Sequence, residues 1–274
     1  MLRLLQISDT HLSPRKRHFE PNWAPLQAWI EAEKPSLILH GGDVTVDGAG
    51  DEGDFRFCAE LFSKLPVPVL AVPGNHDVGE PRHPYQPVNP DRLARWRRHL
   101  GPDYWSRDIE QWRLIGLNSQ LLGSGEAEEN KQFAWLNSTM SDARGRRIAW
   151  FLHMPLFLDH PGEGDMGYWT VKPEPRLPLL ELISGYNVAL VASGHVHRSR
   201  DCHRDSTRYV WAPSSGFVCG PATQPPMSGE SRLGAVIYRF DGNEVEVEIK
   251  NVDGLMAYRI DDVIHEVYPP REAA

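Results

Sequence analysis

Apolar and polar positions divide the chain into short strand-like runs separated by helical patterns. Six runs are apolar and rich in β-forming residues without regular alternation: residues 2–8, 36–42, 67–74, 113–119, 147–153 and 187–194. A continuous apolar run bounded by turn residues is typical of a strand that is buried on both faces. These segments are therefore predicted to be interior strands of covered sheets.

Four segments between these runs have a helical pattern. One is predicted to begin at Asp54 as its N-cap, and a second begins at the pair Asn89 and Pro90 and ends at Gly101. The other two span residues 129–140 and 175–185. The inward-facing residues of the first two helices are predicted to be Cys58, Leu61, Phe62, Leu65, Leu93, Trp96 and Leu100. Strands that alternate with helices predict an α/β fold.

The C-terminal part has a different pattern. Two alternating runs flank Asp241-Gly242-Asn243, which predicts a β-hairpin over about residues 233–251 that extends a sheet. The loops at residues 79–90 and 220–231 are rich in Pro and Gly but too short to be domain linkers. We therefore expect residues 1–274 to form a single domain.

Composition narrows the class of protein. The chain has 274 residues, of which 41% are hydrophobic and 24% charged, as in ordinary soluble globular proteins. A formal net charge of −8 makes nucleic acid an unlikely partner, because nucleic-acid binders carry a basic footprint. Two basic clusters, residues 15–18 and 92–99, are interpreted as a solvated loop and a solvated helix face, with phosphate steering as the alternative.

Cysteine usage and the N-terminus indicate a cytoplasmic protein. Cys58, Cys202 and Cys219 are an odd, widely spaced set, which predicts reduced thiols and neither a disulfide framework nor a cysteine zinc site. The first residues have too short an apolar stretch for a signal peptide, and no run is long enough to cross a membrane. No membrane partner is expected, and homo-oligomer formation is left open.

Polar side chains follow five of the predicted strands at their carboxyl ends. In chain order they are Asp9 and His11, then Asp43, then Asn75, His76 and Asp77, then His153, and then His195 and His197. Ligands bind at this edge in open α/β sheets. We therefore expect all of these side chains to converge on one site.

Their chemistry indicates a metal centre. Carboxylate oxygens and imidazole nitrogens suit Zn²⁺, Mn²⁺ or iron, and the absence of thiolates argues against a structural zinc site. Side chains two apart on an extended segment project to the same side, so Asp9 with His11 and His195 with His197 would each present two ligands together. Any one of these motifs alone is more typical of a turn or of a packed histidine. The whole set is about what two ions that share a carboxylate require.

The motifs D-x-H (Asp9, His11), G-D (Gly42, Asp43), G-N-H-D (residues 74–77), a lone His153 and G-H-x-H (residues 194–197) resemble those of the calcineurin-like metallophosphoesterases. The resemblance covers residues 1 to about 200. It implies a four-layer αββα fold, in which two mixed β-sheets packed as a sandwich are flanked by helices around a dinuclear centre.

The resemblance also implies a role for each residue. It assigns one metal ion to Asp9, His11, Asp43 and His197, and the other to Asp43, Asn75, His153 and His195, so that Asp43 bridges. His76 would face the substrate without binding metal, and Asp77 would orient it. Many members of the family read G-D-x-x-D, whereas the next carboxylate here is Asp47, which we interpret as a solvated loop residue without a role. His40 is interpreted as a packed strand residue close enough to support the ligands. The remaining histidines are expected to be structural or on the surface: His18, His83, His99, His160, His203 and His265.

The implied reaction is hydrolysis of a phosphate ester, with two ions of Mn, Fe or Zn and with His76 as the proton donor to the leaving group. The motif set is most similar to the small bacterial branch that contains cyclic-nucleotide and glycerophosphodiester phosphodiesterases, which favours a small phosphodiester. The alternatives are a phosphomonoesterase, a metal-site scaffold without catalysis, and a nuclease. Tyr168 and Trp169, within residues 160–176, would either rim the pocket and stack on a base or pack their loop against the core.

Overall fold

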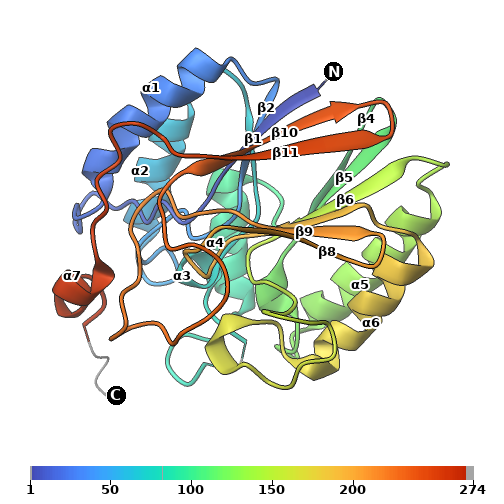
Figure 1. Cartoon of the computed structure of the whole chain (residues 1–274). Helices are drawn as coiled ribbons and strands as arrows, with labels where there is room; N and C mark the ends of the chain where they lie inside the picture. Colours follow the sequence, from blue (N-terminus) through green and yellow to red (C-terminus); the bar gives the residue numbers. More distant parts are fainter. Residues whose placement is uncertain (1, 82, 270–274) are drawn as a thin grey trace.

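Two mixed β-sheets face each other, and helices cover their outer faces (Figure 1). The structure is a computed structural model that describes residues 2–81 and 83–269. The first sheet has the order β11-β10-β1-β2-β3 and the second the order β4-β5-β6-β7-β9-β8. This is the αββα architecture that the motif set predicted.

The first sheet consists of β1 (Leu2–Ile7), β2 (Leu37–His40), β3 (Val69–Ala71), β10 (Ala235–Asp241) and β11 (Glu244–Lys250). The second consists of β4 (Trp105–Ile109), β5 (Trp112–Leu117), β6 (Arg147–Leu152), β7 (Leu190–Ser193), β8 (Arg200–Arg204) and β9 (Thr207–Trp211). The helices are α1 (Trp23–Glu33), α2 (Glu52–Phe62), α3 (Asn75–Val78), α4 (Pro90–Leu100), α5 (Ala127–Ser141), α6 (Pro173–Gly185) and α7 (Ile260–Val267). All six predicted strands are present, and their observed bounds lie within one residue of the predicted runs or inside them.

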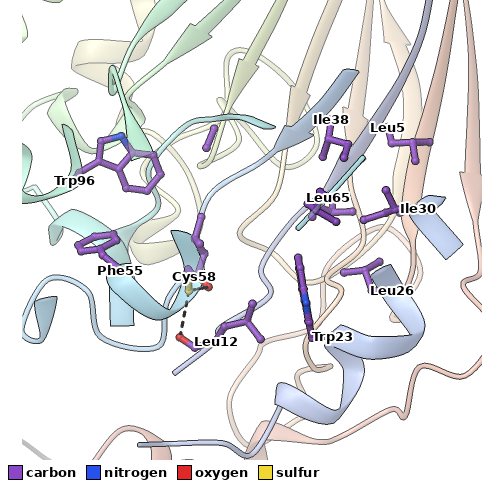
Figure 2. Packing of buried hydrophobic residues seen from close by; sticks show 14 of the residues in the cluster. Leu5, Leu12, Trp23, Leu26, Ile30, Ile38, Phe55, Cys58, Leu65 and Trp96 are labelled. Carbon is purple, nitrogen blue, oxygen red and sulfur yellow. Dashed lines mark hydrogen bonds between the residues drawn. The ribbon is translucent and has the colours of Figure 1, made fainter. Parts of the chain in front are cut away.

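Successive residues of the inner strands belong to different cores, which explains the lack of alternation in the sequence. In β1, Leu5 belongs to a cluster with α1 and α2, whereas Leu4 packs between the two sheets. Figure 2 shows the helix-side cluster, where Leu5 lies near Ile30 of α1. In β6, Trp150 packs toward α5 and α6 while Phe151 faces the first sheet. Both faces of each central strand are therefore apolar.

The sequence pattern did not predict β4, β8 and β9. The strands β4 and β8 are the antiparallel edges of the second sheet, and several of their residues are exposed and charged. An edge strand of this kind has no continuous apolar run to reveal it. At the other end of the chain, β10 pairs with β1 and β11, and the hairpin turn lies between Asp241 and Glu244.

One predicted helix start is wrong. The helix α2 is capped by Asp51, whose side chain accepts a hydrogen bond from the Gly53 amide at 2.8 Å. Asp54 lies inside the first turn, where its buried carboxylate accepts from Ser13 Oγ at 2.7 Å. Leu65 falls beyond the helix end. Two carboxylates three residues apart both suit an N-cap, and the tertiary contact with Ser13 decides between them.

The start of α4 is as predicted. The Asn89 side chain accepts from the Arg92 amide at 2.9 Å, Pro90 is the first helical residue, and Gly101 ends the helix at φ 86°. The basic residues of this helix form ion pairs, such as Arg97 with Asp103. The three cysteines are free. Among residues 2–81 and 83–269, no helix has both the length and the apolar character needed to cross a membrane.

Candidate metal centre

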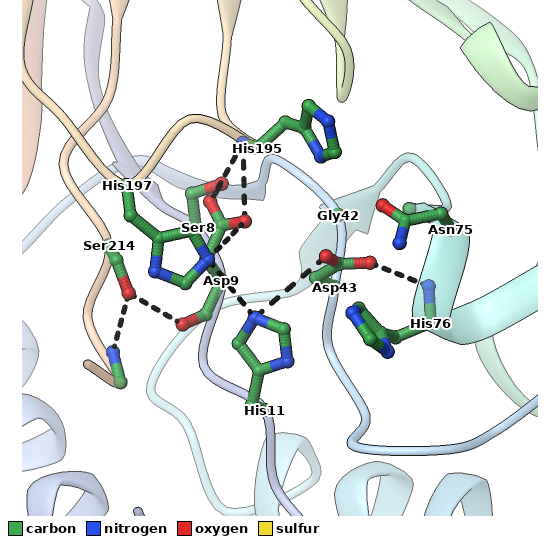
Figure 3. Close-up of polar contacts among 12 residues, drawn as sticks. Ser8, Asp9, His11, Gly42, Asp43, Asn75, His76, His195, His197 and Ser214 are labelled. Atoms are coloured by element: carbon green, nitrogen blue, oxygen red, sulfur yellow. Dashed lines mark hydrogen bonds and ion pairs between the residues drawn. The ribbon is translucent and has the colours of Figure 1, made fainter. Parts of the chain in front are cut away.

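The loops that follow β1, β2, β3, β6 and β7 meet at one edge of the two sheets (Figure 3). Backbone hydrogen bonds join the first two loops, from Asp9 N to the Gly42 oxygen at 2.9 Å and from His11 N to the Asp43 oxygen at 3.1 Å. The seven predicted ligands are all buried, none more than 5% exposed: Asp9, His11, Asp43, Asn75, His153, His195 and His197. The structure thus brings together side chains from five separate loops.

These side chains form two groups that meet at Asp43. Ligand atoms of Asp9, His11 and His197 lie within 4.8 Å of one another, as do those of Asp43, His153 and His195. The Asp43 Oδ2 atom is 3.8 Å from His11 Nε2 and 3.3 Å from His153 Nε2. One carboxylate oxygen is therefore close to both groups, which is the geometry that a bridging ligand needs.

The backbone conformation of the ligands differs from the extended segments expected from the sequence. Five of the seven have positive φ, between 44° and 68°: Asp9, His11, Asp43, His195 and His197. Such left-handed positions are uncommon for residues other than glycine and often occur at functional sites. As a result, His195 and His197 do not project to the same side. The His195 side chain joins the group of Asp43 and His153, and the His197 side chain joins the group of Asp9 and His11.

Gly74 is constrained by space and not by its backbone angle, because its φ is −101°. A Cβ atom on Gly74 would lie 2.1 Å from Asp43 Oδ1 and 2.4 Å from Asp43 N. Glycine is required here because the loop that carries Asn75 must approach Asp43 closely.

Hydrogen bonds on the outer side fix the tautomers of three imidazoles. Carbonyl oxygens can only accept, so His153 Nδ1 donates to Gly41 at 2.9 Å, and His197 Nδ1 donates to Phe217 at 2.9 Å. His195 Nε2 likewise donates to the backbone carbonyl oxygen of Tyr168 at 2.8 Å. Outer partners of this kind orient histidines that ligate metals.

The inner nitrogens then fit a cation. His195 Nδ1 and His153 Nε2 are 3.2 Å apart, and in neutral rings both carry lone pairs with no proton between them. A metal ion can accept both of these lone pairs, and in the metal-free protein a proton on His153 Nε2 can lie in the same space. In the described ranges, only histidines form ion pairs with the buried carboxylates of Asp9 and Asp43. A cation would also offset this buried negative charge.

The electrostatics of the centre give a pH dependence. Burial opposes the charged form of His153, but the Asp43 carboxylate outweighs it and raises the pKa of His153 to about 9. Below that pH a proton occupies the inner nitrogen, and this proton must leave when metal binds. The affinity of the metal-free protein for Mn²⁺ should therefore rise by about tenfold per pH unit between pH 6 and 8. Calorimetric titration in buffers of different ionisation enthalpy measures both affinity and proton release, and a flat profile would contradict the assignment of His153.

His76 lies at the mouth of the centre. Its backbone amide donates to Asp43 Oδ1 at 2.9 Å, and its ring centroid is 5.1 Å from that of His11. Unlike the seven buried side chains, it is partly exposed and lines a cavity of about 370 Å³. Burial lowers the pKa of His76 below its usual value, although Asp43 opposes the shift. The negative charge of a bound phosphate would raise this pKa again.

Asp77 does not have the predicted contact with the His76 imidazole. Its carboxylate accepts from the amides of Gly74 at 2.9 Å and Thr45 at 3.0 Å, and from Thr45 Oγ1 at 2.7 Å. Asp77 is the third residue of the short helix α3, so its side chain reaches back to the helix start, away from its neighbour. It holds the loops after β2 and β3 together.

Asn75 is oriented toward the group formed by Asp43, His153 and His195. Its Oδ1 atom lies 3.2 Å from His153 Nε2, and its Nδ2 atom donates to the Tyr168 hydroxyl at 3.1 Å. The amide oxygen therefore faces the ligand atoms. Tyr168 lines a cavity at the edge of the site, whereas Trp169 packs against the buried cluster of Leu158, Val196 and Trp211. Each of the two alternatives for this segment therefore holds for one of its aromatic residues.

Of three further residues, Asp47 and His83 lie closer to the site than expected, whereas His40 lies where it was predicted. Asp47, expected to be a solvated loop residue, lines the cavity beside His76 and accepts from Gln86 Nε2 at 2.9 Å. His83, expected to be structural or on the surface, lines the same cavity. His40 is packed in its strand, where its Nε2 atom is 3.0 Å from Thr10 Oγ1.

Tyr268 is the main residue of the site that the sequence motifs did not predict. Its hydroxyl is 2.7 Å from His11 Nδ1, and its ring centroid is 4.4 Å from that of His76. It belongs to no motif and follows the last ligand by 71 positions (268 − 197), so the sequence offers no signal for it. Lys16, in the first basic cluster, lines the same cavity.

The two mixed sheets bring together two clusters of Asp and His side chains that meet at Asp43, which is the arrangement of a site for metal ions. Residues 2–199 match the family described as calcineurin-like phosphoesterase, and the chain belongs to this family. The family is dinuclear-metal dependent, and the Asp and His groups of this chain could bind such ions. The chain is accordingly a phosphoesterase.

Individual relatives differ in activity. The chain is 27% identical over 226 residues to the 3',5'-cyclic adenosine monophosphate phosphodiesterase CpdA of Escherichia coli, covering 78% of this chain and 76% of that protein. It is 31% identical over 202 residues to the serine/threonine-protein phosphatase CPPED1 of Danio rerio, covering 69% of this chain and 63% of that protein. Among solved structures, GAP50 of Plasmodium, the anchor in the inner membrane complex, is similar in fold, with a TM-score of 0.67, 15% identity and coverage of 93% and 86%.

Proposed function

We propose that the chain, working as a single domain, is a phosphodiesterase that uses two ions of Mn, Fe or Zn to hydrolyse a small phosphodiester, such as a cyclic nucleotide or a glycerophosphodiester. The observation that carries this proposal is the pair of ligand groups that meet at Asp43. Asp9, His11, Asp43 and His197 would hold one ion, and Asp43, Asn75, His153 and His195 the other. The relative that hydrolyses cyclic adenosine monophosphate supports the diester.

The bound ions would lower the pKa of water and neutralise charge on the phosphoryl group. The protein's own residues then have three tasks. Asp43 would keep the two ligand groups in register, since its Oδ2 atom lies near both. The carbonyls of Gly41, Tyr168 and Phe217 hold three histidines in the tautomer that presents a lone pair inward. An imidazole nitrogen of His76 would deliver a proton to the leaving oxygen.

Two cavities at the mouth of the centre favour a diester. One, of about 370 Å³, lies beside His76, and the other, of about 360 Å³, is lined by Tyr168. Both cavities are bordered by Glu80 and His83, so they adjoin. A phosphodiester carries two substituents, and each cavity offers space for one of them.

A substrate panel tests the proposal. Bis(p-nitrophenyl) phosphate, p-nitrophenyl phosphate, cyclic AMP, glycerophosphodiesters and single-stranded DNA would each be assayed with Mn²⁺ after metal content has been measured. We expect about two ions per chain and a higher kcat/KM for the small diesters. Preference for the monoester would favour the phosphomonoesterase alternative. A chain without bound metal and without activation by Mn²⁺ would leave only the scaffold alternative.

Replacing Asn75 with alanine should weaken one metal site selectively. Asn75 offers a single neutral oxygen, which lies 3.2 Å from His153 Nε2. Titration of the metal-free variant with Mn²⁺ should show one site near its wild-type affinity and one weakened by about tenfold or more. Two unchanged sites would show that Asn75 is not a ligand.

A further inference from the structure

The C-terminal segment returns to the metal centre after the last strand of the first sheet. It contains α7, which lies beyond residues 2–199 and so outside the part that matches the family. The segment is fixed at several points. The Asp261 carboxylate accepts from the amides of Gly220 at 2.9 Å and Ala222 at 3.1 Å, and Lys16 Nζ donates to the Val267 oxygen at 2.5 Å. In Figure 1, α7 lies apart from the layers that cover the sheets.

These contacts place Tyr268 between a predicted metal ligand and the predicted proton donor. Its hydroxyl lies 2.7 Å from His11 Nδ1. Its ring stands over the His76 ring, with centroids 4.4 Å apart and an interplanar angle of 32°. Both aromatic rings line the cavity of about 370 Å³. Tyr268 therefore borders the space where a leaving group next to His76 would lie.

The direction of the hydrogen bond follows from the position of His11. Its Nε2 atom faces His197 Nε2 at 3.3 Å and Asp43 Oδ2 at 3.8 Å, so this is the nitrogen available to a metal ion. A neutral His11 that binds metal through Nε2 carries its proton on Nδ1 and donates it to the Tyr268 hydroxyl. Tyr268 thus does for His11 what backbone carbonyls do for His153 and His197.

We propose that Tyr268 is a positioning and specificity-determining residue of this site, whose hydroxyl orients His11 and whose ring limits the size of the leaving group beside His76. The inference rests on the proposed function, because it takes His11 as a metal ligand and His76 as the neighbour of the leaving group. The two parts of the side chain act separately, so two substitutions separate their effects.

Tyr268→Phe removes the hydroxyl and keeps the ring. Calorimetric titration of the metal-free variant with Mn²⁺ should show one site weakened by about 10–100-fold, the usual effect of losing an outer partner of a histidine ligand. The control is Tyr258→Phe, a tyrosine of the same segment whose hydroxyl contacts only Met256 Sδ, at 3.8 Å, among the described residues. Wild-type affinity at both sites in Tyr268→Phe would overturn the role of the hydroxyl.

Tyr268→Ala removes the ring as well and opens the cavity. The probes are methyl p-nitrophenyl phosphate and methyl 4-methylumbelliferyl phosphate, which differ in the size of a good leaving group. At saturating Mn²⁺, the ratio of kcat/KM for the larger ester to that for the smaller should rise about tenfold in Tyr268→Ala and stay at the wild-type value in Tyr268→Phe. An unchanged ratio in Tyr268→Ala would overturn the role of the ring.

Circular dichroism and thermal unfolding test whether each variant keeps the fold. Tyr268→Phe keeps the aromatic ring, so it should remain folded even if Tyr268→Ala does not. Failure of the proposed function has a different signature. If the wild-type chain with bound Mn²⁺ hydrolyses neither ester, the phosphodiesterase proposal fails, while the titration still tests the contact between Tyr268 and His11. If the wild-type chain is active and both variants behave like it, only the role of Tyr268 fails.

Discussion

Replacing Asp43 with alanine should remove bound metal and phosphoesterase activity together. The Asp43 carboxylate is the only side chain whose oxygen lies near both ligand groups among the described residues, so its loss affects both ions. Without the two ions, the variant should lose about 4 kcal/mol of transition-state stabilisation, so its rate should be about 10³-fold lower than that of the wild type. Elemental analysis and the hydrolysis of bis(p-nitrophenyl) phosphate measure the two effects.

Thermal unfolding separates this effect from misfolding. Mn²⁺ at about 100 times its dissociation constant should stabilise the wild-type chain by about 2.7 kcal/mol for each bound ion, and this gain should be absent in Asp43→Ala. Without metal, the variant should also be less stable than the wild type, because Asp43 pairs with His153 at 3.3 Å and accepts from the His76 amide at 2.9 Å. The gain in stability on adding Mn²⁺ is therefore measured against the metal-free form of each protein. Asp142→Ala, at an exposed carboxylate after α5, is the control that should retain both metal and activity. Two tightly bound ions in Asp43→Ala would refute the bridging role.

Replacing His76 with alanine should leave the metal content near that of the wild type while the rate falls. The loss should depend on the leaving group: about 10²–10⁴-fold for a poor alkoxide that needs a proton, and much less for nitrophenolate. The reason is position, since His76 lies at the cavity while the seven buried side chains face inward. Parallel assays of an alkyl and a nitrophenyl phosphodiester, with metal content measured on the same samples, test this expectation.

Two outcomes would contradict this expectation. Equal losses on both diesters would contradict the role of His76 as proton donor. A loss of metal would instead make His76 a ligand, since it lies within reach of His11 and Asp43. His203→Ala, at an exposed histidine on the edge strand β8, is the control and should match the wild type on both substrates. For the alkyl diester, activity should also fall as the pH rises above the pKa of His76 in the complex, because only the protonated ring can donate.

The sequence by itself determined the interior strands and the chemistry at their ends. The six apolar runs were predicted because a strand buried on both faces must be apolar at successive positions, as Leu4 and Leu5 are. The polar residues after five of these strands were visible because Asp and His are uncommon among buried apolar residues and mark the points where the runs end. The edge strands β4 and β8 were not visible, because their exposed positions accept charged residues.

Tertiary structure alone decided how the side chains of the site are aimed. Local spacing predicted extended segments, but contacts between loops hold five of the ligands at positive φ and send His195 and His197 to different groups. The same contacts turned Asp77 toward Gly74 and Thr45 instead of His76. Tyr268 reaches His11 from 257 positions away in the chain, through the docking of α7. Residue types determine which chemistry is available, whereas orientation depends on long-range contacts that no local pattern encodes.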